Sequence, residues 1–212
     1  MKKLFLATSL LAACGSSDDD GDDGVAPTGT LLDTIEVPCP MMDVASAGDD
    51  GYLYVSGWSY MPLSVTVGRS PTNCAARIDL ATRALDTAWT TTFPPITGGS
   101  EASALRAVEG DQGVLAVFHG SGVPVTEGMD MWDLDVADDD WELYDVALGT
   151  KAATATGVTF GDGSFYETHL DDRYFVYLGD GDGTLVYERT ASGYQPRFRS
   201  AGWMSRLFQL RE

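Results

Sequence analysis

The sequence predicts an all-β fold built from a repeated unit of short strands. Helical periodicity of useful length is absent, whereas short runs of β-branched and aromatic residues, separated by Gly, Asp and Pro, recur throughout the chain. Similar runs, each opened by a glycine or acidic turn, begin about 60 residues apart. These observations place the folded region, which we expect over residues 31–212, in the all-β class.

The N-terminal residues read as a targeting segment. Lys2 and Lys3 precede an apolar run, Leu4 to Leu11, which suits a secretory signal but is too short to span a bilayer. The following Leu11-Ala12-Ala13-Cys14 resembles the bacterial lipobox, which implies a signal peptide over residues 1–13 and a covalent lipid on Cys14. The alternative is a buried N-terminal helix with an incidental cysteine.

Residues 14–30 are expected to form a disordered acidic tether. Gly15 to Gly24 holds five aspartates and no apolar side chain, so this stretch has nothing to bury. Several acyl chains on Cys14 would hold the protein firmly to a membrane. Gly15 after the lipidated cysteine resembles lipoproteins sorted to the outer membrane of Gram-negative bacteria, which implies that the protein faces the periplasm or the cell surface.

The repeated unit is predicted to contain four antiparallel strands. The first strands are expected at residues 42–47, 104–109 and 155–160, and the second strands at 51–57, 113–120 and 172–180. Third strands are expected at residues 75–80, 129–136 and 183–189, and fourth strands at 84–91, 141–147 and 194–200. Extra strands are expected at the two ends, over residues 31–37 and 202–212.

Repeated four-stranded antiparallel units are typical of β-propeller blades. The segment RIDLATRALDTAW, which begins at Arg77, resembles the outer hairpin of quinoprotein-like propellers. Three blades are fewer than the four to eight that close a propeller. We therefore expect a truncated propeller or one completed by a homodimer, and a β-sandwich of about twelve strands is the alternative.

The three cysteines divide into an anchor and a pair. If Cys14 is lipidated outside the cytoplasm, Cys39 and Cys74 remain, and a disulfide is the default expectation for such a pair in an oxidising compartment. Two buried free thiols are the alternative. A metal site at this pair is disfavoured because neither His119 nor His169 stands at ligand spacing.

The charge and the motifs argue against several functions. A formal net charge of −19 should repel nucleic acid, so no nucleic-acid partner is expected. Sequence motifs for a nucleophile elbow, a zinc protease, a nucleotide loop or a redox cysteine pair are absent. His119 near Ser121 reads as a turn histidine, and His169 is expected to join a charge network with its acidic neighbours. No catalytic residue is assigned, and whether the chain is an enzyme is left open, with a non-enzyme as the preferred interpretation.

The acidic turns and the tryptophans suggest two further kinds of site, a calcium site and a sugar-binding surface. Asp180 and Asp182 are candidate calcium ligands, but the spacing around them fails the EF-hand pattern, so Asp-Gly hairpin turns are the preferred interpretation. The five tryptophans could form a sugar-stacking platform, although packing between blades explains them more simply.

Three functional hypotheses follow. The first is a lipid-anchored binding or scaffold module for an unknown protein or small molecule. The second is an accessory to siderophore or other nutrient uptake, because the order of lipobox, acidic tether and propeller resembles myxobacterial lipoproteins associated with iron-siderophore transport. The third is a propeller-type metal-dependent enzyme.

Overall fold

Antiparallel strands dominate the computed structural model of the chain, which describes residues 2–5, 34–40, 42–120, 122–135, 139–170, 172–181, 183–202 and 204. The all-β prediction is confirmed at the level of three antiparallel sheets, none of which closes on itself, and a sandwich is compatible with them. Cys14, the tether over residues 14–30 and most of the expected strand 202–212 lie outside the described residues. The predicted boundaries therefore stay predictions.

Sheet 1 is formed by the first third of the folded region. Its strand order is β3 (Met42–Ala47), β4 (Tyr52–Gly57), β5 (Cys74–Asp79) and β6 (Ala84–Leu85), and β7 (Thr91–Thr92) also pairs with β5. The turn between β3 and β4 contains Gly51, whose φ of 85° is strained for side-chain-bearing residues. The prediction of one continuous strand over 84–91 is wrong, because the residues between β6 and β7 form a turn. The Asp86 carboxylate accepts hydrogen bonds from the backbone N–H groups of Ala88 and Trp89 and stabilises this turn.

Sheet 2 lies next along the chain. Its strands, in spatial order, are β11 (Ala152–Phe160), β10 (Trp141–Ala147), β9 (Gln112–Phe118) and β8 (Glu101–Glu109). The strand predicted at 155–160 exists, but it closes sheet 2 instead of opening the third unit. The reason is that no strand occupies the described residues between β9 and β10, so the next two strands complete this sheet.

The missing strand is replaced by a short helical turn. Residues 129–136 alternate between apolar and polar types, which predicts a strand, but the structure has the 3₁₀ helix η1 (Met131–Leu134). The carboxylate of Asp130 accepts a hydrogen bond from the backbone N–H of Trp132 and caps this helix. Such local side-chain to backbone bonding competes with strand pairing, which explains the wrong prediction.

Sheet 3 is a regular four-stranded meander. Its strands are β12 (Asp162–Leu170), β13 (Arg173–Asp180), β14 (Gly183–Thr190) and β15 (Gly193–Ala201), paired in chain order. The predicted strands at 172–180, 183–189 and 194–200 correspond to β13, β14 and β15. The strand β12 was not among the predicted members of the repeat.

Three smaller elements complete the fold. β1 (Lys2–Phe5) pairs antiparallel with β2 (Thr34–Val37), and because β1 lies in the predicted signal peptide, this pairing belongs to the uncleaved chain. The helix α1 (Met61–Thr66) joins β4 to β5, begins with Pro62 in its first turn and buries Met61 and Leu63. None of the described helices is long and apolar enough to cross a membrane.

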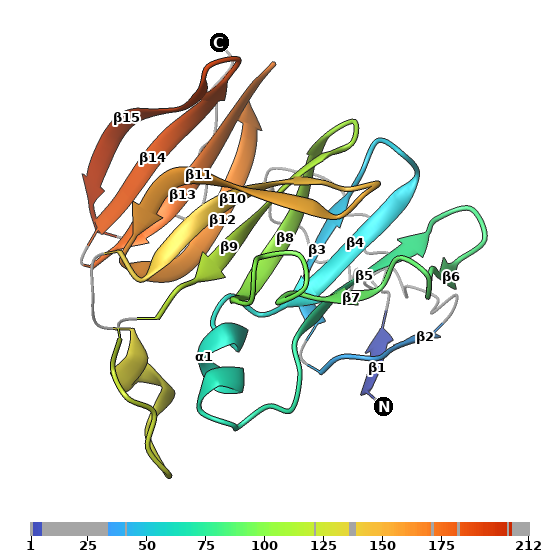
Figure 1. Cartoon of the computed structure of the whole chain (residues 1–212). Coiled ribbons are helices and arrows are strands. Elements are labelled where there is room, and N and C mark those ends of the chain that lie inside the picture. Colours follow the sequence, from blue (N-terminus) through green and yellow to red (C-terminus); the bar gives the residue numbers. More distant parts are fainter. Residues whose placement is uncertain are drawn as a thin grey trace, which may run out of the picture.

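The three sheets lie side by side in chain order, with sheet 1 in blue to green, sheet 2 in green to gold and sheet 3 in orange to red (Figure 1). Each sheet has two ends of different character. The turns that join β3 to β4, β8 to β9, β10 to β11 and β12 to β13 gather at what we call the hairpin end. The helices α1 and η1 contact each other at the opposite end, which we call the helical end.

Apolar side chains fill both spaces between the sheets. The core between sheets 1 and 2 includes Tyr54, Leu105, Leu115 and Val117. A second core, between sheets 2 and 3, includes Val114, Ala116, Phe118, Trp141, Phe160, Phe165 and Val176. Successive residues of β9 therefore point into different cores, as the alternation of a strand requires. This explains why β9 reads as a continuous apolar run.

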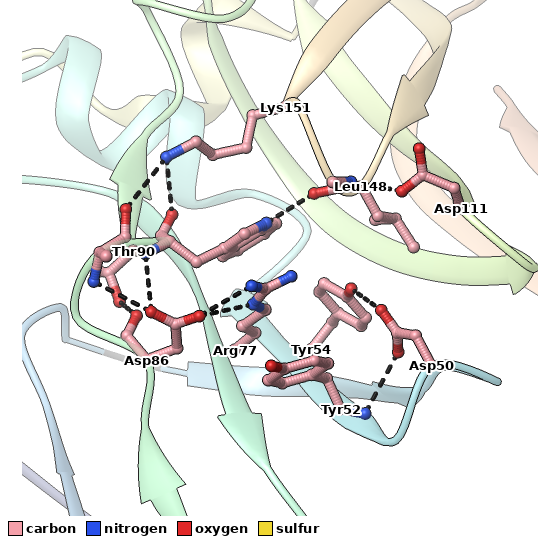
Figure 2. A network of polar contacts seen from close by, with 12 residues as sticks. Asp50, Tyr52, Tyr54, Arg77, Asp86, Thr90, Asp111, Leu148 and Lys151 are labelled. Carbon is pink, nitrogen blue, oxygen red and sulfur yellow. Dashed lines mark hydrogen bonds and ion pairs between the residues drawn. The ribbon is translucent and has the colours of Figure 1, made fainter.

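Polar contacts join sheets 1 and 2 at the hairpin end (Figure 2). The Trp89 indole N–H donates to the carbonyl of Leu148 at 2.6 Å, and Lys151 Nζ donates to the carbonyl of Trp89 at 3.1 Å. Arg77 binds Asp86 through two nitrogens at 2.9 and 2.8 Å and lies over the ring of Tyr52. These contacts attach the irregular outer part of sheet 1 to the β10–β11 turn.

A disulfide joins Cys39 to Cys74, as the cysteine count predicts, with the two Cα atoms 5.9 Å apart. Cys39 follows β2 and Cys74 begins β5, so the bridge attaches the N-terminal ribbon to sheet 1. Both side chains are buried, at 5% and 1% exposure, which leaves little access for a reductant.

Removing this bridge should lower the free energy of unfolding by about 3–4 kcal/mol, because the cross-link reduces the entropy of the unfolded chain. The test is urea denaturation of the wild type and of the Cys39→Ala/Cys74→Ala double variant, each with and without dithiothreitol. We expect the reductant to shift the wild-type midpoint and to leave that of the double variant unchanged. Equal midpoints for the oxidised wild type and the double variant would contradict the prediction.

Candidate functional site

An aromatic cluster covers part of the helical end. Trp58 and Tyr60 lie in the connection between β4 and α1, Trp132 lies in η1, and Trp141 begins β10. Ring centroids are 5.3 Å apart for Trp58 and Tyr60, 4.9 Å for Tyr60 and Trp132, and 6.3 Å for Tyr60 and Trp141, each with edge-to-face geometry. This geometry is favourable for aromatic pairs and fixes the rings with respect to one another.

The cluster has a buried base and an exposed top. Trp141 is fully buried and stacks near Phe118 and Phe160, whereas Trp132 is 49% exposed. The close approach of sheet 3 to this base depends on Gly163, where a Cβ atom would lie 2.6 Å from Cζ2 of Trp141. An exposed indole held over a rigid aromatic base offers a flat apolar surface to a ligand.

Two carboxylates lie within the same cluster. Trp141 Nε1 donates to Asp135 Oδ1 at 2.7 Å, and the hydroxyl of Tyr60 donates to Asp162 Oδ1 and lies 2.7 Å from Ser164 Oγ. Asp162 also accepts from the backbone N–H of Ser164 at 2.8 Å. The aromatic rings are therefore held by carboxylates from the end of η1 and from the start of β12.

The carboxyl group of Asp135 is a weaker acid than that of an ordinary aspartate. Burial raises the pKa of its carboxyl to about 6, the negative charges of Asp162 and Asp140 add to the increase, and the hydrogen bond from Trp141 opposes it. Burial and the hydrogen bond to Asp162 also raise the pKa of the Tyr60 hydroxyl, which stays protonated. A perturbed carboxyl next to an exposed aromatic ring is the kind of combination that marks a functional surface.

We define the aromatic–carboxylate site by Trp58, Tyr60, Trp132, Asp135 and Asp162. The sequence identified two of its tryptophans as a potential sugar platform, but it did not indicate the two aspartates or Tyr60. Trp58 and Trp132 come from connections of two different sheets, and their ring centroids lie 6.2 Å apart at the end of the molecule where α1 contacts η1. The remaining local signal is the aspartate-rich segment around Trp132.

The other residues singled out in the sequence are dispersed. His119 Nε2 lies 3.0 Å from Glu142 Oε2, while its neighbour Ser121 is outside the described residues. Asp180 forms an ion pair with Arg199 at 2.8 Å, and Asp182 is outside the described residues. Among the described residues no group of three or more metal-ligating side chains is found. The predicted calcium role of Asp180 and Asp182 stays a prediction.

The predicted charge network around His169 is partly visible. Arg106 Nε and Glu167 Oε2 form an ion pair at 2.7 Å, and the His169 ring meets that of Tyr174 edge-on at 4.9 Å. Arg173 instead pairs with Glu188 at 2.7 Å, and Asp171 lies outside the described residues.

Comparison with known proteins adds no relative. The chain matches no protein-family model, and no curated protein is significantly similar to it. The functional argument therefore depends on the sequence motifs and on the geometry of the site.

The acidity of Asp135 gives a pH-dependent stability. Its pKa is about 6 in the folded chain and 3.8 for an unperturbed aspartate. The folded state therefore binds more protons between these values, and its stability falls as the pH rises through them. Asp135→Asn should remove this loss and stabilise the protein at pH 7.5 by about 1 kcal/mol, a value reduced for the partial solvation of the site.

The measurement is thermal unfolding from pH 3.5 to pH 8 for the wild type and for Asp135→Asn. The exposed Asp133, in the same 3₁₀ helix, supplies the matched control Asp133→Asn. We expect only the change at residue 135 to flatten the profile between pH 4 and pH 6. Parallel profiles for the wild type and Asp135→Asn would show that this prediction is wrong.

Proposed function

We propose that this protein is a lipid-anchored, extracytoplasmic binding module, without catalytic activity, that uses the aromatic–carboxylate site to hold its ligand. The observation that carries the proposal is the half-exposed Trp132, fixed by packing against Trp58 and Tyr60 and placed beside carboxylates. An indole face stacks on the apolar face of a sugar ring, and carboxylates accept hydrogen bonds from hydroxyl groups. A hydrophilic ligand with a flat face, such as an amino sugar, matches this chemistry.

The anchoring part of the proposal is supported by the sequence Leu11-Ala12-Ala13-Cys14 and by the acidic segment that follows. The lipid on Cys14 would place the protein in the outer membrane, and residues 15–30 would separate the folded region from the bilayer. The folded region would then be free to bind soluble or wall-attached ligands.

We also propose that the three sheets are blades of an open β-propeller. Their chain-order arrangement and the apolar cores between them support this view over a two-layer sandwich. A second copy of the chain would supply the sheets needed for a closed ring, whereas a truncated propeller would stay monomeric, and light scattering distinguishes these two masses.

Lipidation should depend on the thiol of Cys14. In a Gram-negative host fed an alkyne-labelled fatty acid, the full chain should carry the label and fractionate with the outer membrane. Cys14→Ser should lose both properties, whereas the neighbouring change Ser16→Ala should keep them. A labelled Cys14→Ser variant, or an unlabelled wild type, would rule out this anchor.

Ligand binding should depend on the exposed indole of Trp132. We expect chitotriose, a trimer of N-acetylglucosamine, to quench the tryptophan fluorescence of the detergent-solubilised chain. Trp132→Ala should weaken its binding about fivefold, and Trp132→Phe should weaken it less, because stacking supplies about 1 kcal/mol. Since Trp132 is half exposed, neither change should greatly lower the melting temperature.

The same titration with a ferric catecholate siderophore tests the alternative, a role in iron-siderophore uptake. Saturable binding of the siderophore alone would favour that role over sugar binding. Absence of binding for both probes, or equal affinities for the wild type and Trp132→Ala, would remove the aromatic–carboxylate site from the proposal.

A further inference from the structure

A separate cavity of about 360 Å³ lies between sheets 2 and 3 at the hairpin end. Residues of sheet 2, Val108 and Glu109, form one side, and residues of sheet 3 form the other, namely His169, Asp172, Tyr174, Arg189, Thr190 and Ala191. Its volume is at the lower end of the range of about 300–1,000 Å³ for small-molecule pockets. The cavity is at the opposite end of the sheets from the aromatic–carboxylate site.

Tyr174 lines this cavity with its ring. Tyr174 is 6% exposed, and its buried hydroxyl has no hydrogen-bond partner among the described residues. Burial raises the pKa of this hydroxyl well above 10, so it stays protonated and able to donate. The hydroxyl is buried behind the cavity wall, so it does not face a ligand in the cavity.

Arg189 is held more loosely than most arginines of the protein. Its Nε is 3.5 Å from Asp145 Oδ1, and its Nη2 is 3.4 Å from Gln112 Oε1. By contrast, Arg77 and Arg173 meet their carboxylate partners at 2.8 and 2.7 Å. The guanidinium of Arg189 has five N–H donors, and its contacts with Asp145, Gln112 and Tyr194 leave others available to an anionic group.

Acceptors complete the lining. Glu109 and Asp172 are both exposed at the mouth of the cavity, on sheet 2 and on the β12–β13 turn. The same cavity thus offers the cationic donor Arg189 together with two carboxylates. Val108, Ala191 and the Tyr174 ring add a small apolar wall.

From this lining we propose that the cavity is a binding site for a small zwitterion, an α-amino acid or a short peptide. The ligand's carboxylate would accept hydrogen bonds from Arg189, and its ammonium group would donate to Glu109 and Asp172. Binding would also fill the space between sheets 2 and 3 and join them more firmly. The inference does not depend on the ligand of the aromatic–carboxylate site.

The experiment is calorimetric titration of the full, detergent-solubilised chain with L-alanyl-L-leucine. N-acetylated and C-terminally amidated forms of the same dipeptide each lack one charge, and we expect each modification to weaken binding at least tenfold. Arg189→Gln and Glu109→Gln should each weaken binding of the unmodified dipeptide by a similar factor. The matched control is Arg199→Gln, also in sheet 3 but not in the cavity lining, which should leave the affinity unchanged.

Glu109 is exposed at a hairpin turn, so its variant keeps the test informative if Arg189→Gln fails to fold. The proposal is overturned if the dipeptide does not bind, if both blocked forms bind as well as the parent, or if Glu109→Gln and a folded Arg189→Gln retain the wild-type affinity. Trp132→Ala should bind the dipeptide normally, which separates this result from the fate of the aromatic–carboxylate site.

Discussion

Strand β9 of sheet 2 is buried on both faces, and the neighbouring sheets are packed around it. Residues of β9 alternate between two cores, with Leu115 and Val117 packing toward sheet 1 and Ala116 and Phe118 packing toward sheet 3. A shift of β9 by one residue would exchange these two sets and leave both cores badly packed. The register of this one strand therefore sets how its two neighbours pack against it.

The two candidate sites follow from that arrangement. Because the sheets are packed through their apolar faces, polar side chains are left to the two ends of each inter-sheet space. At the helical end, long connections supply α1 and η1, which carry the rings and the carboxyl group of Asp135. At the hairpin end, tight turns leave the cavity lined by Arg189 and Tyr174. Both sites thus lie where strands end, on a scaffold that holds their residues rigidly.

Local sequence patterns predicted most strands, and they failed where a side chain competes with the backbone. The continuous apolar runs of β4, β9 and β13 are unambiguous because these strands are buried on both faces. The sequences of the turn at Asp86 and of the helix capped by Asp130 alternate as strand sequences do. In each case one carboxylate accepts a backbone hydrogen bond and stabilises the turn or helix in place of a strand. Replacing one predicted strand by η1 was enough to shift the assignment of β11 to the wrong sheet.

The candidate sites were less predictable, because their residues meet only in the folded chain. Trp58 and Trp132 were noted as aromatic residues, and Asp135 lies in the aspartate-rich segment around Trp132, yet Tyr60 and Asp162 gave no local signal. Of the residues that line the cavity between sheets 2 and 3, the sequence drew attention only to His169 and Asp172. Their partners were expected among adjacent residues of the chain. Arg189 and Glu109 come from different sheets, and they are too far apart in the sequence for one short motif to contain both.

The disulfide also determines how the molecule would respond to pulling. Tension entering from the N-terminal side reaches Cys39 and passes through the bridge directly to Cys74 in β5. The intervening residues, which include β3, β4 and α1, lie inside the closed loop and are shielded from that tension. A protein tethered through Cys14 could therefore extend residues 34–37 under load while the sheets and both candidate sites keep their shape.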